Sequence, residues 1–230
     1  MTYVMSDIHG NYEAFKKMLR EINFTDDDLL YIAGDLVDYG SESMDLICDI
    51  SMRANVYAVV GDHDFTALKM LAKFDRVLAS GEAPDAEFAA AMKEWVSDGG
   101  APTLEGFRRL DGEMREGVID YLSDLALFEE ITVKDQDYVI VHAGIRNFGA
   151  ETVLDELGPD DFIYESLDPE REYYEDKTVI AGHIHTNELP DPEPNMIYYG
   201  NGTIFLDCGS DKNGTLGCLC LDNGKEFYVR

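Results

Sequence analysis

The chain has 230 residues, of which 45% are hydrophobic and 28% are charged, values of an ordinary globular protein rather than of a disordered one. It carries 18 Lys and Arg residues against 47 Asp and Glu residues, a formal net charge of −29 at pH 7, so nucleic acids and anionic membranes are excluded as partners on electrostatic grounds. No stretch approaches the roughly 20 apolar residues that span a bilayer, and the N-terminus shows no signal-peptide pattern, so we expect a cytoplasmic location.

Apolar residues in the first sixty positions predict three strands, each followed by a loop and a helix. Strands are expected at Tyr3–Met5, Leu29–Ala33 and Val56–Val60, with amphipathic helices over residues 12–22 and around Ser43–Met52. Strands that alternate with helices in this way are typical of a parallel sheet. Because ligands gather at the carboxyl ends of strands in such sheets, we expect functional residues directly after each strand.

The rest of the chain predicts a helical block and then further strands. Residues 65–126 are expected to be mostly helical and to cap or flank the site. A hairpin is predicted from Phe128–Val133 and Tyr138–Val141, and a charged, tyrosine-rich loop over about residues 150–176. The remaining strands are expected at Val179–Ala181, Ile197–Tyr199, Ile204–Asp207, Leu216–Leu221 and Phe227–Val229. The four cysteines lack zinc-site spacing and are expected to be reduced thiols: Cys48, Cys208, Cys218 and Cys220.

All five histidines of the chain follow predicted strands and have glycine, aspartate or both beside them: His9, His63, His142, His183 and His185. One such histidine is most often a hydrogen-bonded loop residue, but five of five, with aspartates in matching places, indicate a shared site. Asp7 and His9 are one residue apart, so a strand would direct both side chains to one face. With Asp35 and Asp62, these carboxylates and imidazoles predict a centre of two divalent transition metals.

Taken in order, these residues resemble the motifs of the calcineurin-like metallophosphoesterases. The motifs are Asp7-x-His9, Gly34-Asp35-x-x-Asp38, Gly61-x-His63-Asp64, His142-Ala-Gly and Gly182-His183-x-His185. The block from Trp95 to Leu104 and the run His142-Ala-Gly-Ile-Arg are further similar to bacterial serine/threonine phosphoprotein phosphatases. The resemblance extends from Met5 to about Gly209. It implies an α/β protein with a single domain over residues 1–230, a four-layer α/β/β/α sandwich with a helical insertion around residues 65–126.

The resemblance also implies a role for each motif residue. One metal would be held by Asp7, His9 and His185, the other by Asp62, His142 and His183, with Asp35 bridging both. Manganese is the expected metal, with iron, zinc and cobalt as alternatives. His63 would protonate the leaving oxygen and Asp38 would orient it, a role compatible with an Asx-turn at Asp38. Arg146 is the candidate phosphate ligand, with a surface salt bridge as the alternative.

Three positions depart from the family motifs. Asp62 stands where the family has asparagine, Tyr39 follows Asp38 in place of an arginine, and Ser166 occupies the place of a later arginine. Two divalent cations and the three carboxylates of Asp7, Asp35 and Asp62 together carry a net charge of +1. With asparagine at position 62 the net charge would be +2. We therefore expect tight metal binding and weak binding of dianionic phosphate.

The sequence leaves three functions open. The leading prediction is metal-dependent hydrolysis of phosphate esters, through in-line attack by a water that two metals activate. The substrate would be a phosphorylated protein or a small phosphoester, as for a serine/threonine protein phosphatase. The close alternative is hydrolysis of dinucleoside polyphosphates such as diadenosine tetraphosphate, which related folds with the same motifs perform. The third is a metal-binding regulatory protein with weak catalysis, favoured by the missing arginines and disfavoured by the intact Asp38 and His63 pair.

Overall fold

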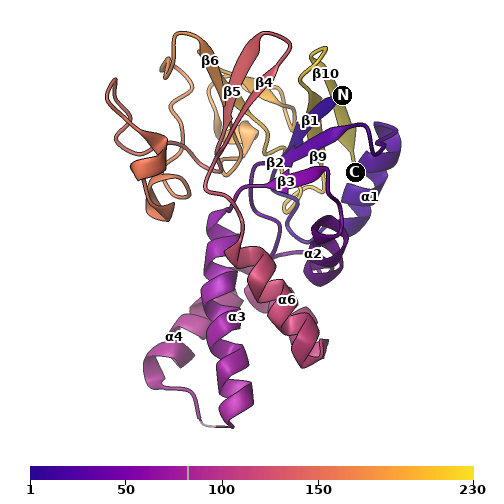
Figure 1. Cartoon of the computed structure of the whole chain (residues 1–230), viewed down its shortest axis with the longest axis vertical. Helices are drawn as coiled ribbons and strands as arrows, with labels where there is room; N and C mark the ends of the chain where they lie inside the picture. Colours follow the sequence, from indigo (N-terminus) through magenta and orange to yellow (C-terminus); the bar gives the residue numbers. More distant parts are fainter. Residues whose placement is uncertain (82) are drawn as a thin grey trace.

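The computed structural model describes residues 1–81 and 83–230, and these fold into two five-stranded β-sheets flanked by helices (Figure 1). The first sheet has the order β10-β9-β1-β2-β3. Its strands are β1 (Thr2–Met5), β2 (Leu29–Ile32), β3 (Val56–Ala58), β9 (Leu216–Cys220) and β10 (Lys225–Val229). Strands β1, β2 and β3 are parallel, as the sequence predicts, and β9 and β10 extend the sheet as antiparallel strands.

The second sheet has the order β4-β5-β6-β8-β7. Its strands are β4 (Glu129–Val133), β5 (Gln136–Ile140), β6 (Lys177–Ala181), β7 (Tyr198–Tyr199) and β8 (Thr203–Phe205). The predicted hairpin is the antiparallel pair β4–β5, and β5, β6 and β8 run parallel to one another. The two sheets stack because apolar side chains alternate along their strands. In β1, Val4 joins Ile180 of β6 in the core between the sheets, whereas Tyr3 and Met5 face the helices.

Two helices, α1 (Tyr12–Glu21) and α2 (Ser43–Ser51), pack on the outer face of the first sheet. The helical insertion consists of α3 (Asp62–Ser80), α4 (Ala86–Trp95), α5 (Ala101–Arg109) and α6 (Gly112–Ser123). Figure 1 shows α3, α4 and α6 extending away from the sheets. The predicted helical block is confirmed, and its first helix begins at Asp62, three residues before the expected start.

The outer face of the second sheet is covered by an irregular segment with two short 3-10 helices, Leu154–Glu156 and Pro159–Asp161. Phe162, Ile163 and Leu167 of this segment are buried against the apolar side chains of β5, β6 and β8. Glycine and proline interrupt the segment, which explains why this layer lacks a long helix. The α/β class with two sheets is confirmed, and its fourth layer is mostly irregular.

The four cysteines are free thiols, as the sequence predicts, and three of them are buried: Cys208, Cys218 and Cys220. No helix in the described part of the chain is long and apolar enough to cross a membrane.

Candidate metal centre

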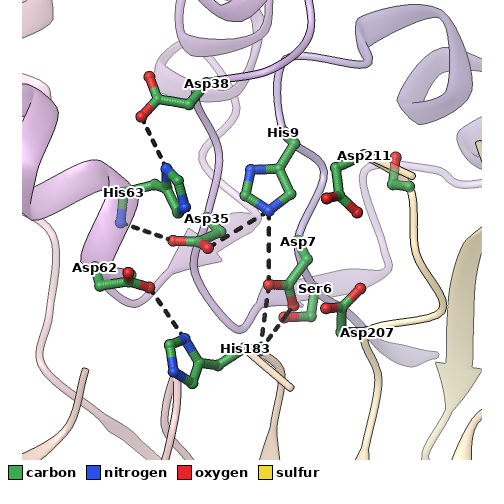
Figure 2. Close-up of polar contacts among 12 residues, drawn as sticks. Ser6, Asp7, His9, Asp35, Asp38, Asp62, His63, His183, Asp207 and Asp211 are labelled. Atoms are coloured by element: carbon green, nitrogen blue, oxygen red, sulfur yellow. Dashed lines mark hydrogen bonds and ion pairs between the residues drawn. The ribbon is translucent and has the colours of Figure 1, made fainter. Parts of the chain in front are cut away.

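The residues that follow β1, β2 and β6 meet at one edge of the two-sheet stack, together with the start of α3 (Figure 2). His142 follows β5, and its Nδ1 lies 2.9 Å from the carbonyl oxygen of Ala33 beside β2. His183 follows β6, and its backbone N–H donates to the Asp7 carboxylate at 3.2 Å. These contacts join the two sheets at the predicted site.

The separations between ligand atoms are those of atoms that bind the same ion. Oδ1 of Asp62 lies 3.0 Å from His142 Nε2 and 3.1 Å from His183 Nδ1. Oδ1 of Asp35 lies 3.5 Å from His142 Nε2, and Oδ2 of Asp35 lies 3.5 Å from His9 Nε2. Two ligands that are each about 2.1 Å from one ion, at angles between 90° and 110°, stand roughly 3.0–3.5 Å apart. Asp35 therefore lies between two sets of donors, as a bridging ligand would.

The backbone at the ligands is unusual. Asp7, His9, Asp35 and His183 have positive φ values of 52°, 50°, 55° and 66°. Non-glycine residues adopt this conformation rarely, and it concentrates at functional sites. Strand β1 ends at Met5, so the prediction that a strand aligns Asp7 with His9 is wrong. The two residues converge because their backbone N–H groups donate to the loop after β2, from Asp7 to the Gly34 carbonyl at 3.0 Å and from His9 to that of Asp35 at 2.9 Å.

Asp62 and His63 belong to the first turn of α3 rather than to a loop. The helix dipole favours a carboxylate at this position. Asp64 fixes the turn, since its carboxylate accepts hydrogen bonds from the Gly61 N–H at 3.0 Å and the Leu36 N–H at 2.9 Å. Sequence reasoning assigned Asp64 no role, although an acid at the third position of a helix is a capping signal.

His63 is held by Asp38, as predicted. The distance from His63 Nδ1 to Asp38 Oδ2 is 2.9 Å. The same oxygen accepts a hydrogen bond from Trp95 Nε1 at 2.9 Å, and the Asp38 N–H donates to Thr103 Oγ1 at 2.9 Å. Burial alone would lower the pKa of His63, but the hydrogen bond with Asp38 and the charge of Asp35 raise it to about 10. In the metal-free chain the His63 side chain is therefore an imidazolium near neutral pH.

The buried carboxylates are unfavourable without a cation. Burial raises the pKa of Asp35 to about 8, even though His142 opposes the shift. Burial and the charge of Asp207 raise the pKa of Asp7 well above its usual value. A divalent cation would remove this penalty, so the donor set fits a metal centre.

Two other predicted ligands have the protonation states that metal binding requires. Burial and the charge of His63 lower the pKa of His9 to about 4, so His9 is a neutral imidazole near pH 7. Burial alone would raise the pKa of Asp62, but hydrogen bonds with His142 and His183 hold it below its usual range.

His185 has different partners from those expected. Its Nδ1 lies 3.5 Å from Asp207 Oδ2 and its Nε2 lies 3.4 Å from Asp211 Oδ1. Sequence reasoning missed both aspartates, although Asp207 lies in the run Leu206-Asp207-Cys208-Gly209 that resembles the family. All three side chains line the same cleft as His9 and Asp35.

The cleft has a volume of about 310 Å³, and both positions where the family has arginine, Tyr39 and Ser166, line it. The Tyr39 side chain is 42% exposed, and its ring centroid is 5.1 Å from that of His63. Lys212 also lines the cleft, whereas Arg146 is not among the described residues that line it. Arg146 instead faces Glu165 at 3.9 Å, the salt bridge that the sequence left as its alternative.

Several curated relatives named "Bis(5'-nucleosyl)-tetraphosphatase, symmetrical" are similar to this chain over alignments of 69 to 94 positions. The relative from Wigglesworthia glossinidia brevipalpis is 36% identical over 77 residues, which are 33% of this chain and 28% of that protein. The relative from Salmonella paratyphi B is 36% identical over an alignment of 94 positions, which covers 37% of this chain and 33% of that protein. The matches thus span about a third or less of the relatives' length.

Among solved structures, a candidate diadenosine tetraphosphatase superposes with a TM-score of 0.65 at 20% identity, covering 99% of this chain and 92% of that one. At this identity the likeness shows the fold. The sequence profile of the calcineurin-like phosphoesterases matches residues 2–187. This match includes every predicted metal ligand, and the chain therefore belongs to the calcineurin-like phosphoesterase family, whose members are hydrolases of phosphate ester bonds.

Proposed function

We propose that this chain hydrolyses dinucleoside polyphosphates, using two divalent cations held at the edge of its sheets. The observation that carries the proposal is the repeated match to relatives named as symmetrical bis(5'-nucleosyl)-tetraphosphatases. These matches favour the alternative from the sequence over its leading prediction, a serine/threonine protein phosphatase. The cytoplasmic location and the choice of manganese stay predictions.

The cleft supports a substrate with a nucleoside beside its phosphates. Tyr39 presents a partly exposed ring next to the metal ligands, where a base could stack on it. With tyrosine and serine in place of the two arginines, the site lacks bidentate clamps for a terminal dianionic phosphate. A phosphate inside a polyphosphate chain carries a single charge and needs such a clamp less.

The proposed mechanism gives separate tasks to the protein groups. Two bound cations would supply Lewis-acid polarisation of the phosphoryl oxygens and acidify a water for in-line attack. Asp35 would hold the cations together, since its two oxygens face different imidazoles. His63 would direct Nε2 at the leaving oxygen, because Nδ1 is engaged by Asp38. As an imidazolium it would also offset the negative charge of the substrate.

The test is a comparison of kcat/KM on three substrates in Mn²⁺: diadenosine tetraphosphate, a phosphoserine peptide and p-nitrophenyl phosphate. We expect diadenosine tetraphosphate to be preferred by at least about a hundredfold over the peptide. Symmetrical cleavage would yield ADP alone, which anion-exchange chromatography separates from ATP and AMP. The variant Asp35→Asn should lose activity on all three substrates, which controls for contaminating phosphatases.

Two outcomes would overturn the proposal. A phosphopeptide that is the best substrate would restore the protein phosphatase as the function. Metal binding without hydrolysis of any of the three substrates would favour the regulatory protein.

A further inference from the structure

A second cluster of potential metal ligands borders the proposed centre. It consists of His185, Asp207 and Asp211, whose ligand atoms all lie within 4.8 Å of one another. Asp207 and Asp211 come from the loop between β8 and β9, whereas His185 follows β6. The family motifs imply no metal ligand from this loop.

Hydrogen bonds connect this loop to the segment that carries His9. Ser210 Oγ donates to the carbonyl oxygen of Ile8 at 3.2 Å, and Asn11 Nδ2 donates to Ser210 Oγ at 3.3 Å. Asp211, the next residue, is thereby held near His9. Figure 2 shows its carboxylate directed toward the side of the cluster where His9 and Asp7 lie.

Asp211 has a carboxylate oxygen that lacks a hydrogen bond. Its side chain is 8% exposed. Its Oδ1 is shielded from solvent and accepts no hydrogen bond from any residue in 1–81 or 83–230. An unsatisfied buried carboxylate oxygen is costly, so its presence at the cleft points to a partner that binds there.

The contacts of His185 identify the nature of that partner. Asp207 is fixed by the Gly209 N–H, which donates to Oδ1 at 2.9 Å, and its Oδ2 faces Nδ1 of His185 at 3.5 Å. Metal-binding histidines usually turn one ring nitrogen to a carboxylate and the other to the ion. The other ring nitrogen, Nε2, lies 3.4 Å from Asp211 Oδ1. Two electron-pair donors at this separation suit ligands of one cation at about 2.1 Å from each.

We propose that Asp211 is a further carboxylate ligand of the cation held on the His9 and His185 side of the centre, with Asp207 as the residue that positions His185. The inference rests on the cation centre of the proposed function but not on the substrate. The carboxylates of Asp7, Asp35, Asp62 and Asp211 would then balance the charge of two divalent cations. Such a neutral centre would hold its metals tightly and inorganic phosphate weakly.

The test is a titration of the metal-free full-length chain with Mn²⁺ by isothermal calorimetry, with bound metal counted by mass spectrometry. We expect two ions per wild-type chain. In Asp211→Asn, one of the two should bind at least about tenfold more weakly, while the other is unchanged. The matched control is Glu188→Gln, which removes one negative charge from an exposed acid that lines the same cleft and pairs with Lys212 at 3.4 Å.

The control separates ligation from general electrostatics. If Glu188→Gln weakens Mn²⁺ as much as Asp211→Asn does, Asp211 is no ligand. If the wild type binds three ions and Asp211→Asn loses one of them, Asp211 belongs to a separate site and does not bind the cation on the His9 and His185 side. A chain that binds no Mn²⁺ would refute the metal centre of the proposed function as well, whereas two unaffected ions in Asp211→Asn would refute this inference alone.

Thermal unfolding tests whether Asp211 has a purely structural role. A salt bridge from Asp211 to His185 would make metal-free Asp211→Asn less stable than the wild type. A ligand role predicts in addition that Asp211→Asn gains less stability than the wild type when Mn²⁺ is added, whereas a salt bridge alone predicts an equal gain in both.

Discussion

At the scale of single residues, the site is a set of charged groups held in costly positions. His63 is the clearest case, because Asp38 keeps it protonated while it lies among the metal ligands. The Asp38 carboxylate is fully buried, and Trp95 holds the oxygen that contacts His63. A protonated histidine at this place can donate its proton to a leaving group, whereas a structural metal site has no use for that proton.

Replacing His63 with glutamine should lower kcat by about 10²- to 10⁴-fold on an alkyl phosphate, since removal of a general acid has effects of this size. The loss should be smaller on p-nitrophenyl phosphate, whose leaving group needs little protonation. Steady-state kinetics on both substrates measures the difference. Equal losses would show that His63 acts by charge alone.

The pH dependence provides a second test of the same pair. Activity of the wild type should fall as the pH rises through the pKa of His63, because the imidazolium is lost. Asp38→Asn removes the interaction that raises this pKa, so the alkaline limb of the kcat profile should move to lower pH. An unchanged limb would assign it to a different group.

Asp62 tests the charge of the centre. Asp62→Asn keeps an oxygen that His142 and His183 can approach, but it removes one negative charge. Inorganic phosphate should then inhibit on the order of tenfold more strongly, since a unit charge at ligand distance from the anion is worth at least this much. An unchanged inhibition constant, measured at saturating Mn²⁺, would refute the charge argument.

Much of the site could be predicted from single residues. The histidines after each strand and their aspartates were found because short motifs preserve their spacing in the sequence. Asp207 and Asp211 could not be found in this way. Their contact with His185 depends on how the loop after β8 is fastened to Ile8, some two hundred residues earlier in the chain.

At the scale of elements, the helical insertion shapes the site through the block from Trp95 to Thr103. Trp95 and Thr103 both bind Asp38, and the Gly99 carbonyl accepts a hydrogen bond from the Tyr39 N–H at 2.9 Å. Gly99 has a φ of 104° and lies so close to the Tyr39 ring that a Cβ atom would stand 2.6 Å from it. The insertion therefore holds the loop that carries Asp38 and Tyr39.

Trp95→Phe should lower kcat by roughly tenfold or more, because a hydrogen bond to a charged group is worth about 1.5–3 kcal/mol. Mn²⁺ affinity should stay the same, since Trp95 contacts no metal ligand through this bond. Phe107→Leu is the matched control, as Phe107 is also buried in the insertion. Equal kinetic effects in the two variants would mean that the loss reflects only poorer packing.

The order and type of the elements followed from hydrophobic periodicity, which is strong in the buried strands. The start of α3 was placed late because Gly61, Asp62 and His63 read as a loop motif. In the structure Gly61 is the N-cap and Asp62 and His63 begin the first turn of the helix, where the capping contact of Asp64 stabilises them. The irregular outer layer agrees with the loop expected over about residues 150–176, although no periodic pattern indicates that its Phe162 and Ile163 pack on the second sheet.

At the scale of the whole molecule, the metal-free chain concentrates negative charge at its own centre. Asp35 has a pKa of about 8 when folded and of about 3.9 when unfolded. Between these values the folded state binds a proton that the unfolded state has released, so the free energy of unfolding falls as the pH rises. The raised pKa of His63 acts in the same direction above pH 6.5.

In EDTA, the unfolding temperature should therefore decrease from pH 5 to pH 8. Mn²⁺ should reverse the trend, because it binds the ionised carboxylates. At a thousandfold excess over its Kd, one ion would add about 4 kcal/mol, or roughly 10 °C for a chain of this size. A metal-free chain that grows more stable across this range would contradict the burial of these aspartates. The single-domain organisation over residues 1–230 stays a prediction, which one cooperative transition in the same experiment would support.

The most direct test of the central claim is anomalous diffraction from crystals grown with Mn²⁺. We predict two peaks about 3.5–4 Å apart, with Asp35 bound to both and Asp211 bound to the peak beside His9. A single peak, or peaks remote from Asp35, would contradict the account.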